Sequence, residues 1–157
     1  MNFMRVPQGG AARAIRRAAA VGAWGVLGAG AVLAQPTPEG LWRNVDDETG
    51  KPHAEIRIAR QGAVLNGRVV KALVSDPEPL CTLCRDDRKD QPKVGMEILR
   101  GVSKAEGREV WEGGKILDPG NGKEYTVRLT PLDGGRQLQV RGYIGPFYRT
   151  QVWQRIE

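Results

Sequence analysis

The chain has 157 residues and carries 24 basic and 18 acidic side chains, so its formal net charge is +6. Its two cysteines are too few for a small scaffold held together by disulfides. The basic residues form no stripe interleaved with aromatic side chains, so the sequence gives no sign of nucleic-acid binding.

The first 34 residues have the pattern of a secretory signal peptide. Four arginines and no acids accompany a small-residue apolar stretch at Ala18–Ala31, and Ala34 offers a small residue at the cleavage point. A transmembrane anchor is the alternative, but this run is shorter than the about 20 residues that cross a bilayer. Arg16 and Arg17 leave twin-arginine export open beside general secretion. We therefore expect a periplasmic or secreted protein of the Gram-negative type, without stable membrane insertion after cleavage.

Cleavage leaves one domain, residues 35–157, with 20 basic and 18 acidic side chains. Within it, Ala54, Ile56 and Ile58 alternate with polar residues, which is typical of a half-buried antiparallel strand. Turns rich in glycine, proline and Asn-Gly separate such segments, and Gly113–Gly114 predicts a kink inside one of them. The expected strands cover residues 40–44, 53–60, 63–74, 95–102, 109–117, 124–130, 137–144 and 149–156.

Eight short strands joined by consecutive turns predict an all-β domain. The pattern favours an eight-stranded antiparallel up-and-down barrel, because closure of the sheet leaves no free edge. A β-sandwich is the alternative. A barrel of this size holds packed side chains or one small ligand.

The long interruption between two of these strands is the loop 75–93, which carries both cysteines, Cys81 and Cys84. In an exported chain we expect them to form a disulfide and the loop to lie at one mouth of the barrel. A redox-active pair or half of a metal site is the alternative. Redox-active pairs of this spacing begin a helix in a strand–helix unit, whereas this pair lies between prolines in an all-β chain. His53, the sole histidine, is expected to be exposed and to bind no metal.

Two groups of residues resemble known proteins. Gly40 and Trp42 in the first strand, with Arg155 in the last, resemble the closing seam of lipocalin-like (calycin) barrels. The resemblance implies that Arg155 packs over the Trp42 indole at the barrel base, a contact that contributes about 0.5–2 kcal/mol. The second group consists of the blocks Gly95–Gly101, Trp111–Pro119, Gly122–Tyr125, Val140–Gly145 and Arg149–Trp153. Together they resemble an exported bacterial family of domains of unknown function, DUF2147.

The DUF2147 resemblance implies a periplasmic or secreted β-barrel. Because that family has no established activity, it supplies no catalytic residue, metal ligand or cofactor. The sequence itself shows no set of nucleophile, base and orienting group. We therefore expect a protein without enzymatic activity.

The last two predicted strands carry a candidate ligand rim. Arg141 and Tyr143 lie on one of them, and Arg149 and Trp153 on the other, so these side chains form polar and aromatic faces that would stack if the two faces meet. The alternative is a solvated outer face.

The leading hypothesis is a small binding or envelope-associated module that holds an apolar or amphipathic ligand. The second hypothesis is a redox- or metal-responsive envelope protein that acts through Cys81 and Cys84. Nucleic acid is excluded as a partner, and the sequence identifies no protein partner.

Overall fold

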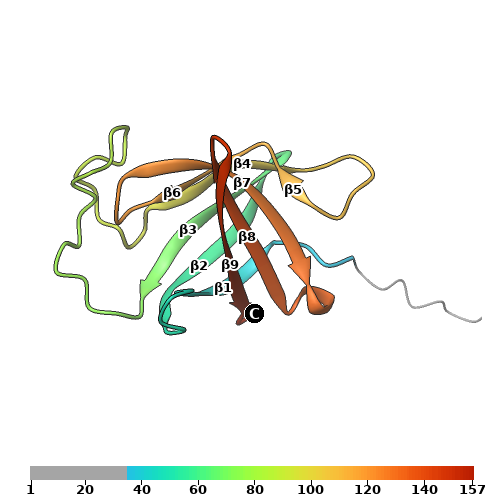
Figure 1. The fold of residues 1–157 in the computed structure, drawn as a ribbon, viewed down its shortest axis with the longest axis horizontal. Coiled ribbons are helices and arrows are strands. Elements are labelled where there is room, and N and C mark those ends of the chain that lie inside the picture. Colours follow the sequence, from blue (N-terminus) through green and yellow to red (C-terminus); the bar gives the residue numbers. More distant parts are fainter. Residues whose placement is uncertain (1–34) are drawn as a thin grey trace, which may run out of the picture. The chain divides into compact units, whose positions relative to one another are not determined.

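The computed structural model describes residues 35–157, so the predicted signal peptide lies outside the described residues. These residues form nine β-strands and one short 3-10 helix, η1, at Asp133–Gly135 (Figure 1). The strands are β1 (Gly40–Val45), β2 (Pro52–Gln61), β3 (Val64–Ala72), β4 (Glu97–Lys104), β5 (Trp111–Glu112), β6 (Lys115–Asp118), β7 (Lys123–Leu132), β8 (Gln137–Ile144) and β9 (Phe147–Arg155). The described residues include no helix long and apolar enough to cross a membrane.

The strands close into an antiparallel barrel. Apart from β5 and β6, each strand pairs with the next along the chain, β3 pairs with β4 across the long loop, and β9 returns to pair with β1. Strands β5 and β6 are two halves of one barrel strand, because both pair with β4 on one side and with β7 on the other. The predicted eight-stranded barrel is therefore confirmed, and the sandwich alternative is excluded. The strand is interrupted at Gly113–Gly114, as the sequence predicts.

Most strand boundaries differ from the sequence prediction by one or two residues, and two of these differences bear on the site. The last strand begins at Phe147 rather than Arg149, because Gly145 and Pro146 alone connect β8 to β9. Gly145 adopts a positive φ of 54°, which lets two residues reverse the chain. The third strand ends at Ala72, and the chain then enters the long loop.

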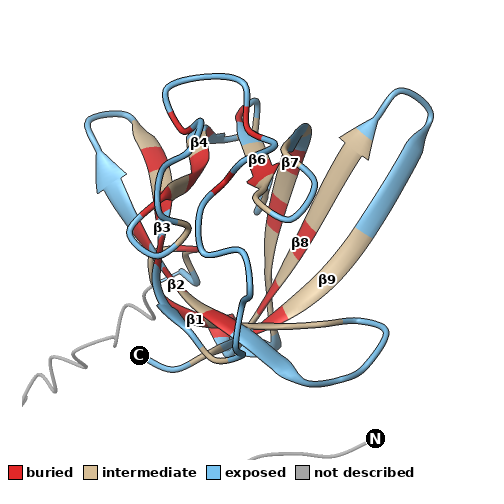
Figure 2. Ribbon diagram, turned by 90° about the vertical axis from the view of Figure 1, so that its left-hand side faces the viewer, coloured by how far each residue is buried: buried red, intermediate tan, exposed pale blue. Residues whose placement is uncertain are grey.

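The core fills the inside of the barrel, and burial decreases along β8 and β9 toward their shared turn (Figure 2). The predicted apolar face of β2 is buried, since Ile56 and Ile58 are each 1% exposed. Burying one such side chain stabilises the fold by about 1.5–3 kcal/mol. Alternation therefore placed the inner face of β2 correctly. The most deeply buried side chains of the core are Trp42, Trp153, Ile56, Ile58, Leu65, Leu99, Leu129, Leu138, Val102 and Val127.

Antiparallel strands place successive connections at alternate ends of the barrel, which gives this barrel two different ends. One end, called the base here, has the short connections at residues 62–63, 105–110 and 133–136, together with residues 35–39 and the C-terminus. The other end, called the mouth, has the connections at residues 46–51, 73–96, 119–122 and 145–146. The loop with the two cysteines therefore lies at the mouth.

Candidate functional site

The base of the barrel is closed by Arg155 and Trp42. The Arg155 guanidinium carbon lies 4.2 Å from the centre of the Trp42 ring, and the two residues are paired in register between β9 and β1. The Trp42 indole N–H donates to the carbonyl of Pro38 at 2.7 Å. Arg155 also donates to the backbone carbonyls of Thr37 and Glu39, at 2.7 and 2.8 Å. Burial lowers the pKa of Arg155, which has carbonyls and an aromatic ring around it.

Gly40 makes room for this arrangement. A Cβ atom at Gly40 would lie 2.3 Å from Nη1 of Arg155 and 2.8 Å from the carbonyl oxygen of Glu157. Its φ of 136° also falls in a region that side chains rarely adopt. The Gly-x-Trp pattern thus has a steric reason, because the glycine admits the guanidinium that covers the tryptophan.

The loop at the mouth is fastened by a disulfide between Cys81 and Cys84, whose Cα atoms lie 5.4 Å apart. Both cysteines are buried, with exposed fractions of 0% and 2%. The sulfur of Cys81 lies 3.5 Å from the carbonyl oxygen of Pro119, in the turn between β6 and β7. The predicted disulfide is therefore present, and it packs against the barrel.

Leu83, between the two cysteines, passes directly over the β6–β7 turn. A Cβ atom at Gly122 would lie 2.1 Å from the Leu83 carbonyl oxygen, and Gly122 has a φ of 68°. Only glycine fits this position without moving the loop. The loop and the turn are therefore built to match each other.

Arg88 joins the same loop to the barrel wall. Its side chain is 4% exposed, and it donates to the carboxylates of Asp86 and Glu124 and to the carbonyl of Glu97. A buried guanidinium needs such partners, because an unpaired charge in the interior costs several kcal/mol. Asp86 and Arg88 belong to the loop, whereas Glu124 lies on β7. The contact thus links three segments of the chain.

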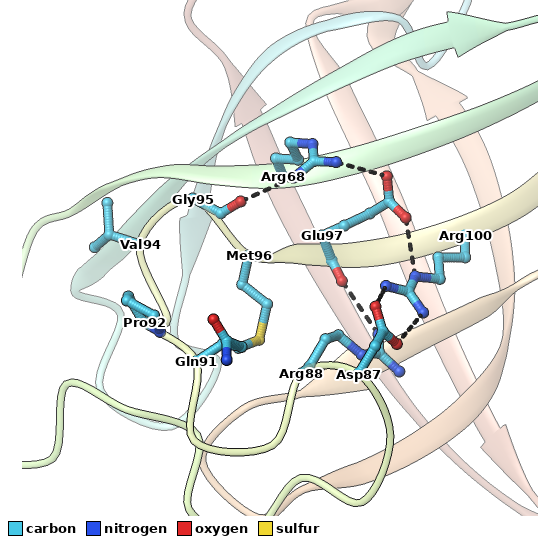
Figure 3. A pocket seen from close by; sticks show the side chains of 10 residues that line it. All are labelled: Arg68, Asp87, Arg88, Gln91, Pro92, Val94, Gly95, Met96, Glu97 and Arg100. Carbon is cyan, nitrogen blue, oxygen red and sulfur yellow. Dashed lines mark hydrogen bonds and ion pairs between the residues drawn. The ribbon is translucent and has the colours of Figure 1, made fainter.

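A cleft of 340 Å³ lies between the loop and the outer side of β3 and β4 (Figure 3). Its guanidinium groups are each matched by carboxylates. Arg68 binds Glu97 at 3.3 Å, and Arg100 binds Asp87 at 2.8 Å and Glu97 at 2.9 Å. The positive charges in the cleft are therefore neutralised by carboxylates, and these ion pairs connect the loop to the barrel. Its lining consists of Arg68, Asp87, Arg88, Gln91, Pro92, Val94, Gly95, Met96, Glu97 and Arg100.

These contacts lower the pKa of the loop carboxylates. The side-chain hydrogen bond from Arg88 lowers the pKa of Asp86 to about 2, although burial opposes the shift. The hydrogen bonds from Arg100 lower the pKa of Asp87 and raise that of Arg100 itself. Both carboxylates are consequently ionised at neutral pH, and the loop is held to the barrel by charge-assisted hydrogen bonds.

Strands β1 and β9 separate toward the mouth. Their register pairs only Trp42 with Arg155 and Arg43 with Gln154 in the described residues. Beyond that point side chains bridge the gap, because the amide of Asn44 donates to Gln151 at 2.9 Å. The inner wall on this side of the mouth is therefore polar.

Further out, the guanidinium of Arg149 binds the carboxylate of Asp47, with its Nε 3.0 Å from Oδ2. The hydrogen bond from Arg149 lowers the pKa of Asp47. This ion pair connects the turn after β1 to β9 and so spans the same gap.

Two apolar side chains extend the inner face of the β8–β9 hairpin past the core. The register pairs Leu138 with Trp153 and, at the tip, Ile144 with Phe147. Because residues two apart in a strand share a face, Ile144 lies on the same side as Leu138. Leu138 is fully buried, whereas Ile144 is 49% and Phe147 73% exposed. The inner face of the hairpin thus becomes open to solvent at the mouth.

The four candidate rim residues lie on two different faces. Arg141 pairs with Thr150, so it lies on the outer face, and Tyr143, two residues further on, shares that face. Arg149 and Trp153 lie on the inner face, where Trp153 is 1% exposed. The polar face of β8 with Arg141 and Tyr143 therefore does not meet the face of β9 with Arg149 and Trp153. The two-residue turn sets a register in which Arg141 lies opposite Thr150, one residue away from Arg149.

Sequence reasoning missed Phe147, Tyr148 and Arg128 as neighbours of the candidate rim. Tyr148 is 62% exposed and its ring centre lies 5.9 Å from that of Tyr143. The sequence contained part of the information needed to find them. Gly145–Pro146 suits a two-residue turn, and such a turn would let the last strand begin at Phe147.

The remaining candidates are His53 and the two cysteines, and the described part of the chain groups no metal ligands around them. His53 is exposed on β2, and its carbonyl accepts a hydrogen bond from Leu73. Cys81 and Cys84 are bonded to each other. Within residues 35–157, no three histidine, cysteine or acidic side chains are grouped as a metal site would require.

Comparisons with known proteins identify the family of the chain and a solved structure with a similar fold. No curated protein matches the sequence. A similar solved structure is that of protein HP1028 from Helicobacter pylori, which is described as belonging to the lipocalin family. It is 17% identical, with a TM-score of 0.66 over 78% of this chain and 84% of that one, a likeness that concerns the fold. The family model described as "Uncharacterized protein conserved in bacteria (DUF2147)" matches residues 40–155. The chain therefore belongs to the bacterial family DUF2147 and has a lipocalin-like barrel.

Proposed function

We propose that this protein is an exported binding protein that holds the apolar part of a small amphipathic ligand at the mouth of its barrel. The observation that carries the proposal is the exposure of Ile144 and Phe147 on the core-facing side of the β8–β9 hairpin, at 49% and 73%. Apolar side chains that face inward and remain open to solvent gain free energy when a ligand covers them, about 25 cal/mol per Å² of apolar area.

The difference between the two ends of the barrel supports entry of the ligand at the mouth. At the base, Arg155 and Trp42 leave the core sealed. At the mouth, Asn44 and Gln151 supply amide groups to the inner wall beside the apolar hairpin. A ligand with an apolar tail and a polar head would find both kinds of surface there, which is why we infer an amphipathic ligand.

We infer that the protein binds its ligand without transforming it. On the inner wall beside the apolar hairpin, the polar side chains are the amides of Asn44 and Gln151 and the guanidinium of Arg149, which is already paired with Asp47. Such groups orient a ligand but supply no activated nucleophile or general base. The fold similarity to a lipocalin-family protein fits this role, although it concerns the fold alone.

Binding can be measured with dansylaminoundecanoic acid, a fluorescent amphipathic probe, added to the mature protein. We expect its emission to rise on binding. The variant Ile144→Asp should weaken binding by about tenfold or more, because a carboxylate would have to be covered by the probe's apolar tail. Val70→Asp is the matched control. Val70 is 46% exposed but follows the core residue Val69 on β3 and therefore faces outward.

Two results would contradict the proposal. One is equal probe affinity of the Ile144→Asp and Val70→Asp variants, which would place binding away from the mouth. The other is the absence of any bound small molecule when the protein is purified from its native periplasm and analysed by native mass spectrometry.

Export is tested separately. The full chain, expressed in a Gram-negative host, should be recovered from the periplasmic fraction with Gln35 at or near its N-terminus. Recovery of the uncleaved chain from the cytoplasm would remove export from the proposal while leaving the ligand experiment intact.

The redox or metal alternative has less support. Exchange-active disulfides are accessible to an attacking thiolate, whereas Cys81 and Cys84 are 0% and 2% exposed. We therefore assign the disulfide a structural role at the mouth.

A further inference from the structure

The outer face of β7, β8 and β9 carries an ordered group of aromatic and basic side chains. The rings of Tyr143 and Tyr148 are paired in register between β8 and β9, and their centres lie 5.9 Å apart. In the next row, Arg141 of β8 lies directly opposite Arg128 of β7. We call Arg128, Arg141, Tyr143 and Tyr148 the tyrosine–arginine platform.

The two arginines of the platform differ in their partners. Arg128 binds the carboxylate of Glu112 at 2.9 Å. Arg141 donates to the hydroxyl of Thr150 at 2.8 Å and lies 4.7 Å from the ring centre of Tyr148. Within residues 35–157, no carboxylate lies within salt-bridge distance of Arg141. Like charges on opposite strands destabilise a sheet, and the one carboxylate partner of Arg128, Glu112, is shared with Arg108. An anion bound at Arg141 would offset the repulsion between Arg141 and Arg128.

This lack of a partner distinguishes the platform from the other arginine-lined surface. In the cleft beside the loop, Arg68 binds Glu97, and Arg100 binds Asp87 (Figure 3). Arg88, in the same cleft, binds the carboxylates of Asp86 and Glu124. An anion that approached that cleft would have to displace those carboxylates. At Arg141 it would meet a guanidinium that is half-buried, held in place by Thr150, and available for charge-assisted hydrogen bonds.

A pocket of 400 Å³ adjoins the platform. Arg128 and Tyr143 belong to both, and the pocket extends to Gly113, at the break between β5 and β6. A Cβ atom at Gly113 would lie 3.9 Å from the Ser103 hydroxyl oxygen, so this part of the wall is loosely packed. Glu112 and Thr126 bring a carboxylate and a hydroxyl to its wall. The platform therefore ends in a recess with hydrogen-bonding groups of both kinds.

We propose that the tyrosine–arginine platform binds an acidic sugar, that is, a short oligosaccharide that carries carboxylates. A pyranose ring has an apolar C–H face that packs on a tyrosine ring, and hydroxyls around its rim that bond to groups such as Glu112 and Thr126. The carboxylate of the sugar would bind the guanidinium of Arg141, whose planar fork matches it. Each feature of the ligand thus corresponds to a feature of this surface.

A nucleic acid fits the same surface less well. Its affinity comes mainly from neutralising many phosphates with lysine and arginine, whereas the platform offers a single arginine without a carboxylate partner. The site is also separate from the barrel mouth. Tyr143 lies on the outer face of β8 and its neighbour Ile144 on the inner face. Loss of ligand binding at the mouth would therefore leave this site unaffected.

Isothermal titration of the mature protein with tetragalacturonic acid tests the proposal. Maltotetraose serves as the uncharged sugar and an eight-nucleotide deoxythymidine strand as the nucleic acid. We expect the uronic acid oligomer to bind more tightly than either. Arg141→Gln should weaken that binding by about tenfold or more, as expected for a charge-assisted hydrogen bond.

Arg136→Gln is the control, because it removes the same charge from a side chain that is 78% exposed in the β7–β8 connection. Its affinity should match that of the unmodified protein. Tyr148→Ala provides a second variant at an exposed position that the core does not need, and it should also weaken binding. Near-ultraviolet circular dichroism of the core tryptophans checks that each variant is folded.

Three outcomes would overturn the proposal. Equal affinity of the folded Arg141→Gln and Arg136→Gln variants for tetragalacturonic acid would show that the Arg141 guanidinium does not bind the sugar carboxylate. Equal affinity for maltotetraose would remove the role of charge. Tighter binding of the deoxythymidine strand would assign the platform to nucleic acid instead.

Discussion

The guanidinium of Arg155 lies 4.2 Å from the centre of the Trp42 ring, at the point where the last strand of the barrel pairs with the first. Main-chain pairing between these strands covers two residue pairs in the described part of the chain. Arg155 extends that short seam, because it also binds the carbonyls of Thr37 and Glu39 in the segment before β1. One side chain thus holds together the two ends of the barrel sheet.

Replacing Arg155 by lysine should therefore destabilise the barrel although the charge is kept. An ammonium group cannot donate to all the carbonyls that the guanidinium reaches, and it stacks less well on the indole. We expect the free energy of unfolding, measured by urea titration, to fall by about 2–4 kcal/mol.

Arg57→Lys is the matched control, because Arg57 forms an ion pair with Glu157 in which the side chains are 45% and 66% exposed. Exposed pairs contribute about 0–1 kcal/mol. Equal stability of the two lysine variants would mean that the seam does not depend on Arg155.

The loop at the mouth should be sensitive to alanine at Gly122. The added Cβ atom would lie 2.1 Å from the Leu83 carbonyl oxygen, so the loop must move. Gly62→Ala is the control, since Gly62 has a φ of 62° but no atom within 4 Å of its Cβ position. Both variants carry a backbone strain of about 1–2 kcal/mol, because alanine disfavours a positive φ. The free energy of unfolding should fall further in Gly122→Ala than in Gly62→Ala.

Hydrogen exchange distinguishes the two glycine variants further. The amide of Cys81 donates to the carbonyl of Gln91 inside the loop. Its exchange should be faster in Gly122→Ala and unchanged in Gly62→Ala. Unchanged exchange in both would show that the loop does not rest on the β6–β7 turn.

Removal of the disulfide should have a moderate effect. The covalent ring that Cys81 and Cys84 close is short, so loop closure contributes about 2 kcal/mol. We expect the double alanine variant to lose about 2–4 kcal/mol, because buried contacts of the sulfurs are lost as well. In the native protein, glutathione should reduce the bond far more slowly than in urea, because both cysteines are buried. Rapid reduction without unfolding would instead support a redox role.

Acid should weaken the attachment of the loop. The hydrogen bond from Arg88 lowers the pKa of Asp86 from 3.8 to about 2 in the folded protein. A group whose pKa is lowered by folding stabilises the protein above its unfolded pKa, and this contribution is lost as the pH falls through its folded pKa. The contribution of Asp86 should therefore disappear between about pH 4 and pH 2.

Two measurements check the acid dependence. Asp86→Asn should flatten the dependence of unfolding free energy on pH in that range. Carbon-detected NMR of the Asp86 carboxyl should give a midpoint near the lower value, and a midpoint near 3.8 would contradict the role of Arg88.

The strands and their inner faces could be predicted from the sequence because both are local properties. Alternation along β2 identifies Ile56 and Ile58 as inward-facing, and the pair Gly113–Gly114 marks the interruption between β5 and β6. The disulfide was also predictable, since two cysteines three residues apart in the sequence are held near one another by the chain itself.

The candidate rim could not be assembled from such local information. Alternation says which residues of one strand share a face, but not which face of the next strand lies beside it. Here the turn at Gly145–Pro146 pairs Arg141 with Thr150 and so separates Arg141 from Arg149. A shift of the register by one residue would have moved Arg149 to the same face as Arg141.

The sequence by itself determined the strands and the spacing of their turns, because hydrophobic period and turn chemistry act over a few residues. It favoured a barrel over a sandwich, and the tertiary structure decided between the two. The tertiary structure alone decided which distant groups meet. Arg88 reaches Glu124 across 36 residues. Among residues 35–157, Arg141 has no carboxylate partner, whereas Arg128 binds Glu112. Such pairings depend on strand register and barrel closure, which follow from packing of the whole core rather than from any one segment.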